Sequence, residues 1–105
     1  MAKRIFKSDR LKQIIGNIAE DFRFSNEMGD YALLFYKAQS QGMISGNEID
    51  DMIEYVKTGL EELQNDMQWR QQYLAENPGT DEMKMLDTMK TIEEEYRDLL
   101  EFLEK

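Results

Sequence analysis

The sequence predicts an all-α protein of four helices, in which two shorter N-terminal helices pack on a long antiparallel helical hairpin, like a helical bundle or coiled coil. Apolar residues recur along most of the chain at the spacing of an amphipathic helix. Two C-terminal stretches keep this spacing as a heptad pattern, which is typical of paired helices. One proline and six glycines among 105 residues leave these elements few interruptions.

The first helix is expected over residues 9–22. Ser8 is a favourable N-cap, and Asp9 places a negative charge in the first turn, where it complements the helix dipole. One helical stripe then holds the apolar residues, namely Leu11, Ile14, Ile15, Ile18, Ala19 and Phe22.

The second helix is expected over residues 27–41, with Ser25 and Asn26 as cap candidates. Gly42 follows the helix at the position where a left-handed backbone conformation commonly ends one. Apolar residues surround much of this helix, so we expect it to be the most buried of the four; they are Met28, Tyr31, Ala32, Leu34, Phe35 and Ala38.

The hairpin is expected from two long helices, 46–76 and 81–103. Ser45 and Glu48 have the spacing of a capping box at the start of the first, and Thr80 or Asp81 caps the second. The first seam is formed by Ile49, Ile53, Val56, Leu60, Leu63, Met67 and Leu74, and the second by Met85, Met89, Ile92, Tyr96, Leu99 and Leu103. Between them, the turn sequence 77–80 contains Pro78, so the second helix folds back on the first.

The whole chain, residues 1–105, is expected to be one domain. It divides into a basic N-terminal arm at 1–8, the two short helices within 9–45, and the hairpin at 46–105. The two short helices are each about half as long as the first hairpin helix, so they can cover only part of the hairpin. We expect them to cover the part near 49–60 and 96–103.

The hairpin tip is therefore predicted to be left under-covered. Its apolar residues are Met67, Trp69, Tyr73, Leu74, Met83, Met85 and Leu86. Exposed methionines and aromatic residues are common at binding surfaces, which makes the tip a candidate partner-binding site. The other interpretation is a narrow seam closed on itself, but such a seam does not explain Trp69 and Tyr73, which flank it.

The net charge of −9 is unevenly distributed, since residues 1–25 carry +3 and the remaining residues −12. An acidic body repels nucleic acid and anionic membranes and favours a basic partner, although acidic residues also simply keep helical proteins soluble. The carboxylates that would form an acidic binding face are Asp50, Asp51, Glu54, Glu61, Glu62, Asp66, Asp87, Glu93, Glu94 and Glu95.

The N-terminal segment is the one basic feature: Lys3, Arg4 and Lys7 lie in the arm, and Arg10 and Lys12 at the start of the first expected helix. These side chains are able to contact phosphates, but single-stranded nucleic acid usually also needs stacking aromatic residues, and only Phe6 lies nearby. We do not expect nucleic acid as the partner. The alternative is that these cations lie against the acidic hairpin of the same chain or of a second copy.

The sequence lacks both histidine and cysteine, which removes the usual proton shuttle and thiol nucleophile. It also contains no phosphate-binding loop motif. We therefore expect no enzyme activity, catalytic residue, cofactor or small-molecule substrate. No apolar run is long enough to cross a membrane, and without cysteines or a signal peptide the cytoplasm is the expected location.

Residues 37–48 resemble an EF-hand loop, with Gly42 at its sixth position and Glu48 at its twelfth. The resemblance covers these twelve residues only. The family places oxygen ligands at the first, third and fifth positions, where this chain has Lys37, Gln39 and Gln41. A lysine in place of the first carboxylate opposes calcium, so we expect no metal site.

These features predict a non-enzymatic, acidic helical module that binds another protein, with a regulatory or structural role. A basic surface on that protein, or a second copy of this chain forming a homodimer, would suit the hairpin. One alternative is an inhibitor that mimics nucleic acid and occupies a basic groove. A second alternative is a self-assembling scaffold, in which the basic end of one copy meets the acidic hairpin of the next.

Overall fold

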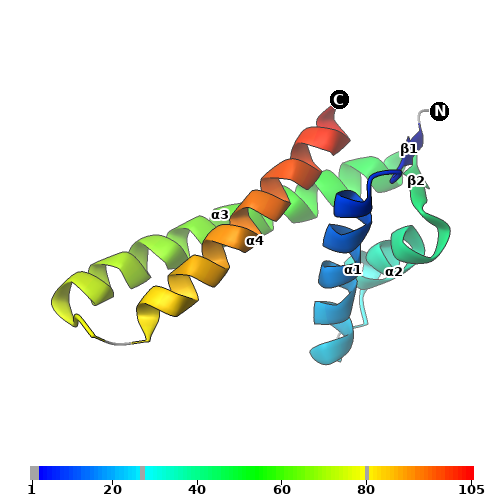
Figure 1. The fold of residues 1–105 in the computed structure, drawn as a ribbon. Coiled ribbons are helices and arrows are strands. Elements are labelled where there is room, and N and C mark those ends of the chain that lie inside the picture. Colours follow the sequence, from blue (N-terminus) through cyan, green and yellow to red (C-terminus); the bar gives the residue numbers. More distant parts are fainter. Residues whose placement is uncertain (1–2, 27, 80) are drawn as a thin grey trace.

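A computed structural model describes residues 3–26, 28–79 and 81–105. The elements follow in the order β1 (Lys3–Ile5), α1 (Asp9–Phe24), α2 (Asp30–Gln41), β2 (Met43–Ser45), α3 (Asn47–Glu76) and α4 (Glu82–Glu104). Helices α3 and α4 form a long antiparallel hairpin, and α1 and α2 pack on it at the end away from the α3–α4 turn (Figure 1). The predicted all-α fold class is confirmed.

Two helix ends form as expected. The Ser8 hydroxyl accepts a hydrogen bond from the Leu11 N–H at 3.3 Å, and Gly42 ends α2 in the left-handed conformation, with φ 72°. The predicted caps of the second helix were wrong, because α2 begins after Gly29. The Ser25 hydroxyl instead donates to the carbonyl of Asp21 at 2.9 Å and so terminates α1. The predicted start at residue 27 lies outside the described residues.

The predicted capping box of the third helix was also wrong. Ser45 belongs to β2, where it pairs with Lys3, and Gly46 takes the N-cap position without a side-chain hydrogen bond. The Glu48 side chain turns to Lys37, with 3.0 Å between Oε2 and Nζ. Asp81 occupies the N-cap position of α4 without a side-chain bond, and Thr80 lies outside the described residues.

Within the predicted N-terminal arm, residues 3–5 form a strand. β1 and β2 pair antiparallel, with Arg4 opposite Ile44, and the Phe6 N–H donates to the Gly42 carbonyl at 2.8 Å. The Phe6 side chain lies in the core, where its ring centroid is 5.5 Å from that of Phe102. The backbone of residues 3–6 is therefore not a free arm, since strand pairing and a buried ring hold it.

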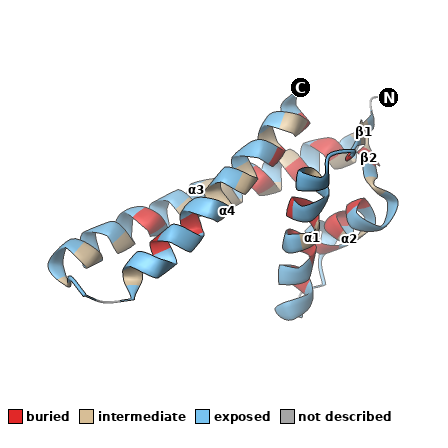
Figure 2. Ribbon diagram, viewed as in Figure 1, coloured by how far each residue is buried: buried red, intermediate tan, exposed pale blue. Residues whose placement is uncertain are grey.

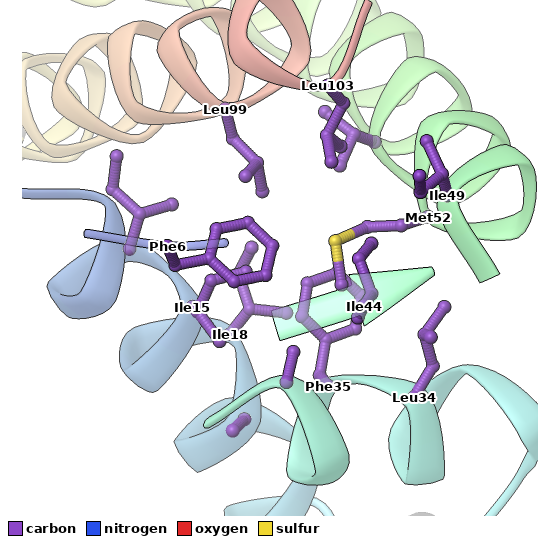
Figure 3. Close-up of a cluster of buried hydrophobic side chains, with 14 of the residues drawn as sticks. Phe6, Ile15, Ile18, Leu34, Phe35, Ile44, Ile49, Met52, Leu99 and Leu103 are labelled. Carbon is purple, nitrogen blue, oxygen red and sulfur yellow. The ribbon is translucent and has the colours of Figure 1, made fainter. Parts of the chain in front are cut away.

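The main core lies where α1, α2 and the two strands meet the open end of the hairpin. Phe35 of α2, Leu99 of α4 and Phe6, which follows β1, point into the same space (Figure 3). The other buried members are Ile14, Ile15, Ile18, Ala19, Phe22, Ala32, Leu34, Ala38, Ile44, Ile49, Met52, Val56 and Leu103. Met28 and Tyr31 were expected in this core but are exposed.

The tip of the hairpin has a separate and smaller cluster. Its buried members are Met67, Leu86 and Met89, with Leu63 and Leu74 partly buried against them. The buried positions of the tip lie only along the facing sides of α3 and α4 (Figure 2). Met85 was expected in this seam but is exposed, because Leu86 fills the position three residues before Met89 instead.

The molecule is elongated, as partial coverage of the hairpin requires. Its principal extents are 51 × 30 × 22 Å, and its radius of gyration is 15.3 Å. A compact domain of this length has a radius of gyration of about 13 Å. The difference arises because the hairpin tip projects beyond the main core (Figure 1).

Gly59 of α3 lies directly against the side chain of Tyr96 on α4. A Cβ added there would lie 2.9 Å from Cε2 of Tyr96 on α4. Burial raises the pKa of the Tyr96 hydroxyl, which also forms a hydrogen bond with Tyr55, so this ring has little freedom to move. The bare Cα of glycine therefore allows the tyrosine pair to fit between the helices.

Substituting Gly59→Ala is expected to destabilise the protein by about 1 kcal/mol, because overpacking outweighs the gain in helix propensity. The matched control is Gly16→Ala in α1, where the nearest atom is the flexible Gln39 amide nitrogen at 3.4 Å. That change is expected to stabilise by about 0.5–1 kcal/mol. Urea denaturation followed by circular dichroism measures both, and equal stabilisation by the two changes would contradict the close packing at Gly59.

Candidate functional site

The predicted aromatic residues of the tip lie exposed on α3. Trp69 is 56% exposed and Tyr73 is 39% exposed. They are one helical turn apart, and their rings stack with centroids 5.6 Å apart and planes inclined by 21°. The pair thus presents a preformed aromatic surface, since each ring limits the rotation of the other.

The remaining apolar residues of the tip fall into two groups. Met83 and Met85 are exposed near the start of α4. Met67 and Leu86 are buried in the seam, and Leu74 is partly buried there, so these three residues hold the helices together. Below, "tip surface" refers to the exposed residues Trp69, Tyr73, Met83 and Met85.

An ion pair braces the two helices beside this surface. Arg70 donates from Nη1 to Glu82 Oε2 at 2.7 Å, and from Nε to Asp66 Oδ2 at 3.4 Å. The hydrogen bond to Glu82 raises the pKa of Arg70 above its ordinary value. Because Arg70 belongs to α3 and Glu82 to the first turn of α4, this contact links the two helices next to the turn.

The predicted acidic residues lie at the protein surface, where Glu93 and Glu95 are half-buried and the others exposed. Asp66 and Glu93 pair with Arg70 and Arg97, and Glu95 accepts a hydrogen bond from Asn17. Within the described parts of the chain, no ion pair involves the seven others, Asp50, Asp51, Glu54, Glu61, Glu62, Asp87 and Glu94. The hairpin therefore presents an excess of negative charge.

The predicted basic residues lie on β1, on α1 and, in the case of Lys7, between them. Arg10 pairs with Asp98 of α4 at 2.7 Å, and the Arg4 guanidinium donates to the Lys105 carbonyl. Lys3, Lys7 and Lys12 are exposed. Phe6 is buried, so its ring is not available among these basic residues to stack on a nucleic-acid base.

A groove that was not expected lies between α2 and the first turns of α3. Its volume is about 460 Å³, and it is lined by Asp30, Tyr31, Leu33, Leu34, Lys37, Glu48 and Asp51. We call this the α2–α3 groove. Leu34 is buried beneath it, whereas Leu33 is 55% exposed. The one hint of it in the sequence was the apolar run at 31–36, which contains more apolar residues than one buried stripe of a helix needs.

Tyr31 is fixed at one wall of this groove. Its ring centroid lies 5.3 Å from that of Tyr55 on α3. Burial, together with the negative charges of Glu54 and Asp51, raises the pKa of the Tyr31 hydroxyl, which donates a hydrogen bond to Glu54. Tyr31 therefore links α2 to the acidic side of α3.

Neither a metal-binding cluster nor a membrane-spanning helix is found in the described residues. At the position where an EF-hand would bind calcium through its last glutamate, Glu48 instead contacts the Lys37 ammonium group. No family model matches the chain, and none of the curated proteins or solved structures matches it either. Its own residues thus provide the basis for assigning a function.

Proposed function

We propose that this chain is a non-enzymatic interaction module that binds another protein, one with a basic surface, through the tip surface of its hairpin. The observation that carries the proposal is the exposed Trp69–Tyr73 stack, on a part of α3 that α1 and α2 leave uncovered. Tryptophan and tyrosine are enriched among the residues that dominate binding energy at protein interfaces.

Two observations on the tip surface support the proposal. Trp69 and Tyr73 are stacked before binding, and the Arg70–Glu82 pair links the two helices beside them, so less conformational entropy is lost on association. The unpaired carboxylates along α3 and α4 also give the hairpin that carries it an excess of negative charge. Such charge steers a basic partner and accelerates encounter more than it increases affinity.

The alternatives rest on the same hairpin. A nucleic-acid-mimicking inhibitor would use the unpaired carboxylates alone, and its binding would weaken steeply with salt. A self-assembling scaffold would place exposed basic residues of one copy, such as Lys3 and Lys7, against the hairpin of the next. The aromatic stack favours the protein-binding module, because neither alternative requires it.

The test is a pull-down from nuclease-treated lysate of the source organism, with elution in rising salt. The double variant Trp69→Ala and Tyr73→Ala is compared with wild type and with the matched control Phe24→Ala and Met28→Ala, which removes exposed apolar side chains from the other end. We expect wild type and control to retain the same partner at high salt. The tip variant should retain it about tenfold less, the loss that about 1.4 kcal/mol produces.

Other outcomes would contradict the proposal in distinct ways. A partner released at modest salt, and unaffected by the tip variant, would support the mimic. Recovery of this chain alone, with a mass beyond a dimer, would support the scaffold. Unchanged helicity by circular dichroism shows that the tip variant remains folded.

A further inference from the structure

We propose a second binding site, distinct from the tip surface: the α2–α3 groove binds a basic, amphipathic segment of a partner protein, one that carries an arginine or lysine beside an apolar residue. The groove lies between α2 and the start of α3, at the end of the molecule away from the α3–α4 turn (Figure 1). It therefore goes beyond the proposed function of the tip and depends on different residues.

The apolar half of the site is Leu33. The residues of α2 that are buried in the core are Ala32, Leu34, Phe35 and Ala38. Leu33 is not one of them. It remains 55% exposed at the edge of a groove of about 460 Å³. This volume lies within the range of sites that bind small ligands or a few side chains.

The charge of the groove selects a cation. Asp30, Glu48 and Asp51 line it, and Glu54 is held beside it by the Tyr31 hydroxyl. The single basic side chain in the lining, Lys37, is already paired with Glu48 at 3.0 Å. Two lining carboxylates, Asp30 and Asp51, are left without an ion pair among the described residues, and they would repel an anionic occupant.

Tyr31 adds an aromatic surface for the same cation. One side of its ring is against Tyr55, its hydroxyl is bonded to Glu54, and the side chain is still exposed to the groove. A guanidinium group above a tyrosine ring is favourable, and more so when the contact is shielded from water. This chain already contains one such contact, with Arg23 5.3 Å from the ring centre of Tyr36.

The experiment titrates ¹⁵N-labelled full-length protein with a blocked peptide, acetyl-Leu-Arg-Leu-Leu-Arg-Leu-amide, and follows amide chemical shifts. The expected result is shift changes concentrated on α2 and the first turns of α3. The variant Asp30→Asn with Asp51→Asn, and separately Leu33→Ser, should each weaken peptide binding about tenfold. A peptide with glutamine in place of both arginines should not bind.

The matched control is Asp87→Asn with Glu94→Gln, which also removes two negative charges, but from exposed, unpaired positions on α4. It should change peptide affinity less than twofold. Equal weakening by control and groove variants, with shifts spread over the hairpin, would overturn the proposal in favour of general charge attraction. If Leu33→Ser alone had no effect, the apolar half of the site would be refuted.

Two further measurements separate this site from other occupants and from the tip. If the groove variants abolish self-association in sedimentation measurements without peptide, the occupant is a second copy, and the proposal is overturned. The double variant Trp69→Ala and Tyr73→Ala should leave peptide binding unchanged. If this variant lost peptide binding, and the peptide changed amide chemical shifts at the tip of the wild-type protein, the groove would not be the binding site. The proposed function of the tip would still stand.

Discussion

Replacing Phe6 with alanine is expected to lower the free energy of unfolding by about 3–5 kcal/mol, the usual cost of removing a buried phenylalanine ring. Phe6 is only 1% exposed and packs against Phe102, near Leu99 and Ile15 (Figure 3). A domain of this size has a total stability of about 5–15 kcal/mol, so this single change removes a large part of it. Urea denaturation monitored by circular dichroism gives the difference.

The adjacent Ile5 provides the control for this prediction. It is the last residue of β1, directly before Phe6, but is 48% exposed, so Ile5→Ala is expected to cost less than about 1 kcal/mol. Equal losses for the two variants would contradict the docking of β1 and Phe6 onto the core. Wild-type stability for both would mean that the strand contributes nothing to folding.

Leu99→Ala is expected to destabilise the whole protein by about 2–5 kcal/mol, whereas Met67→Ala is expected to open mainly the hairpin tip. Leu99 is fully buried in the main core, in which α1, α2 and both hairpin helices take part. Met67 belongs to a cluster of three buried residues supplied by α3 and α4 alone. Met67 packs only against residues of the tip, so its replacement should have little effect on the main core.

Hydrogen exchange of backbone amides distinguishes the two responses. Leu99→Ala should accelerate exchange in all four helices together, because the main core is lost as a unit. Met67→Ala should accelerate exchange near the turn and leave α1 and α2 close to wild type. Uniform acceleration in the Met67 variant would show that the two clusters unfold cooperatively, contrary to the prediction.

Hydrophobic periodicity was sufficient to predict the helices and the hairpin, because long amphipathic helices repeat their signal over many turns. It was not sufficient to predict β1 and β2. Each strand has only three residues, too few for a two-residue alternation to be distinguished, and Phe6 therefore resembled an aromatic residue of a basic arm. The missed strand also accounts for the wrong capping box, since Ser45 was already used for pairing.

The tip shows how far sequence patterns can locate exposed residues. The exposure of Trp69 and Tyr73 was anticipated, because they flank the heptad positions of α3. Met85 and Leu86 could not be separated, since both fall at an allowed spacing before Met89, and only the helix packing decides which faces α3. The α2–α3 groove was not predictable, because it depends on the orientation of α2 relative to a helix that follows a strand.

The straight hairpin also acts as a spacer. A partner at the tip surface and a second at the α2–α3 groove would be held apart by the intervening turns of α3, within a molecule 51 Å long. Each added residue lengthens a helix by about 1.5 Å, so one extra heptad in both α3 and α4 would separate the two partners by about 10 Å more while keeping the seam in register. The number of residues in α3 thus sets the distance between whatever the two ends hold.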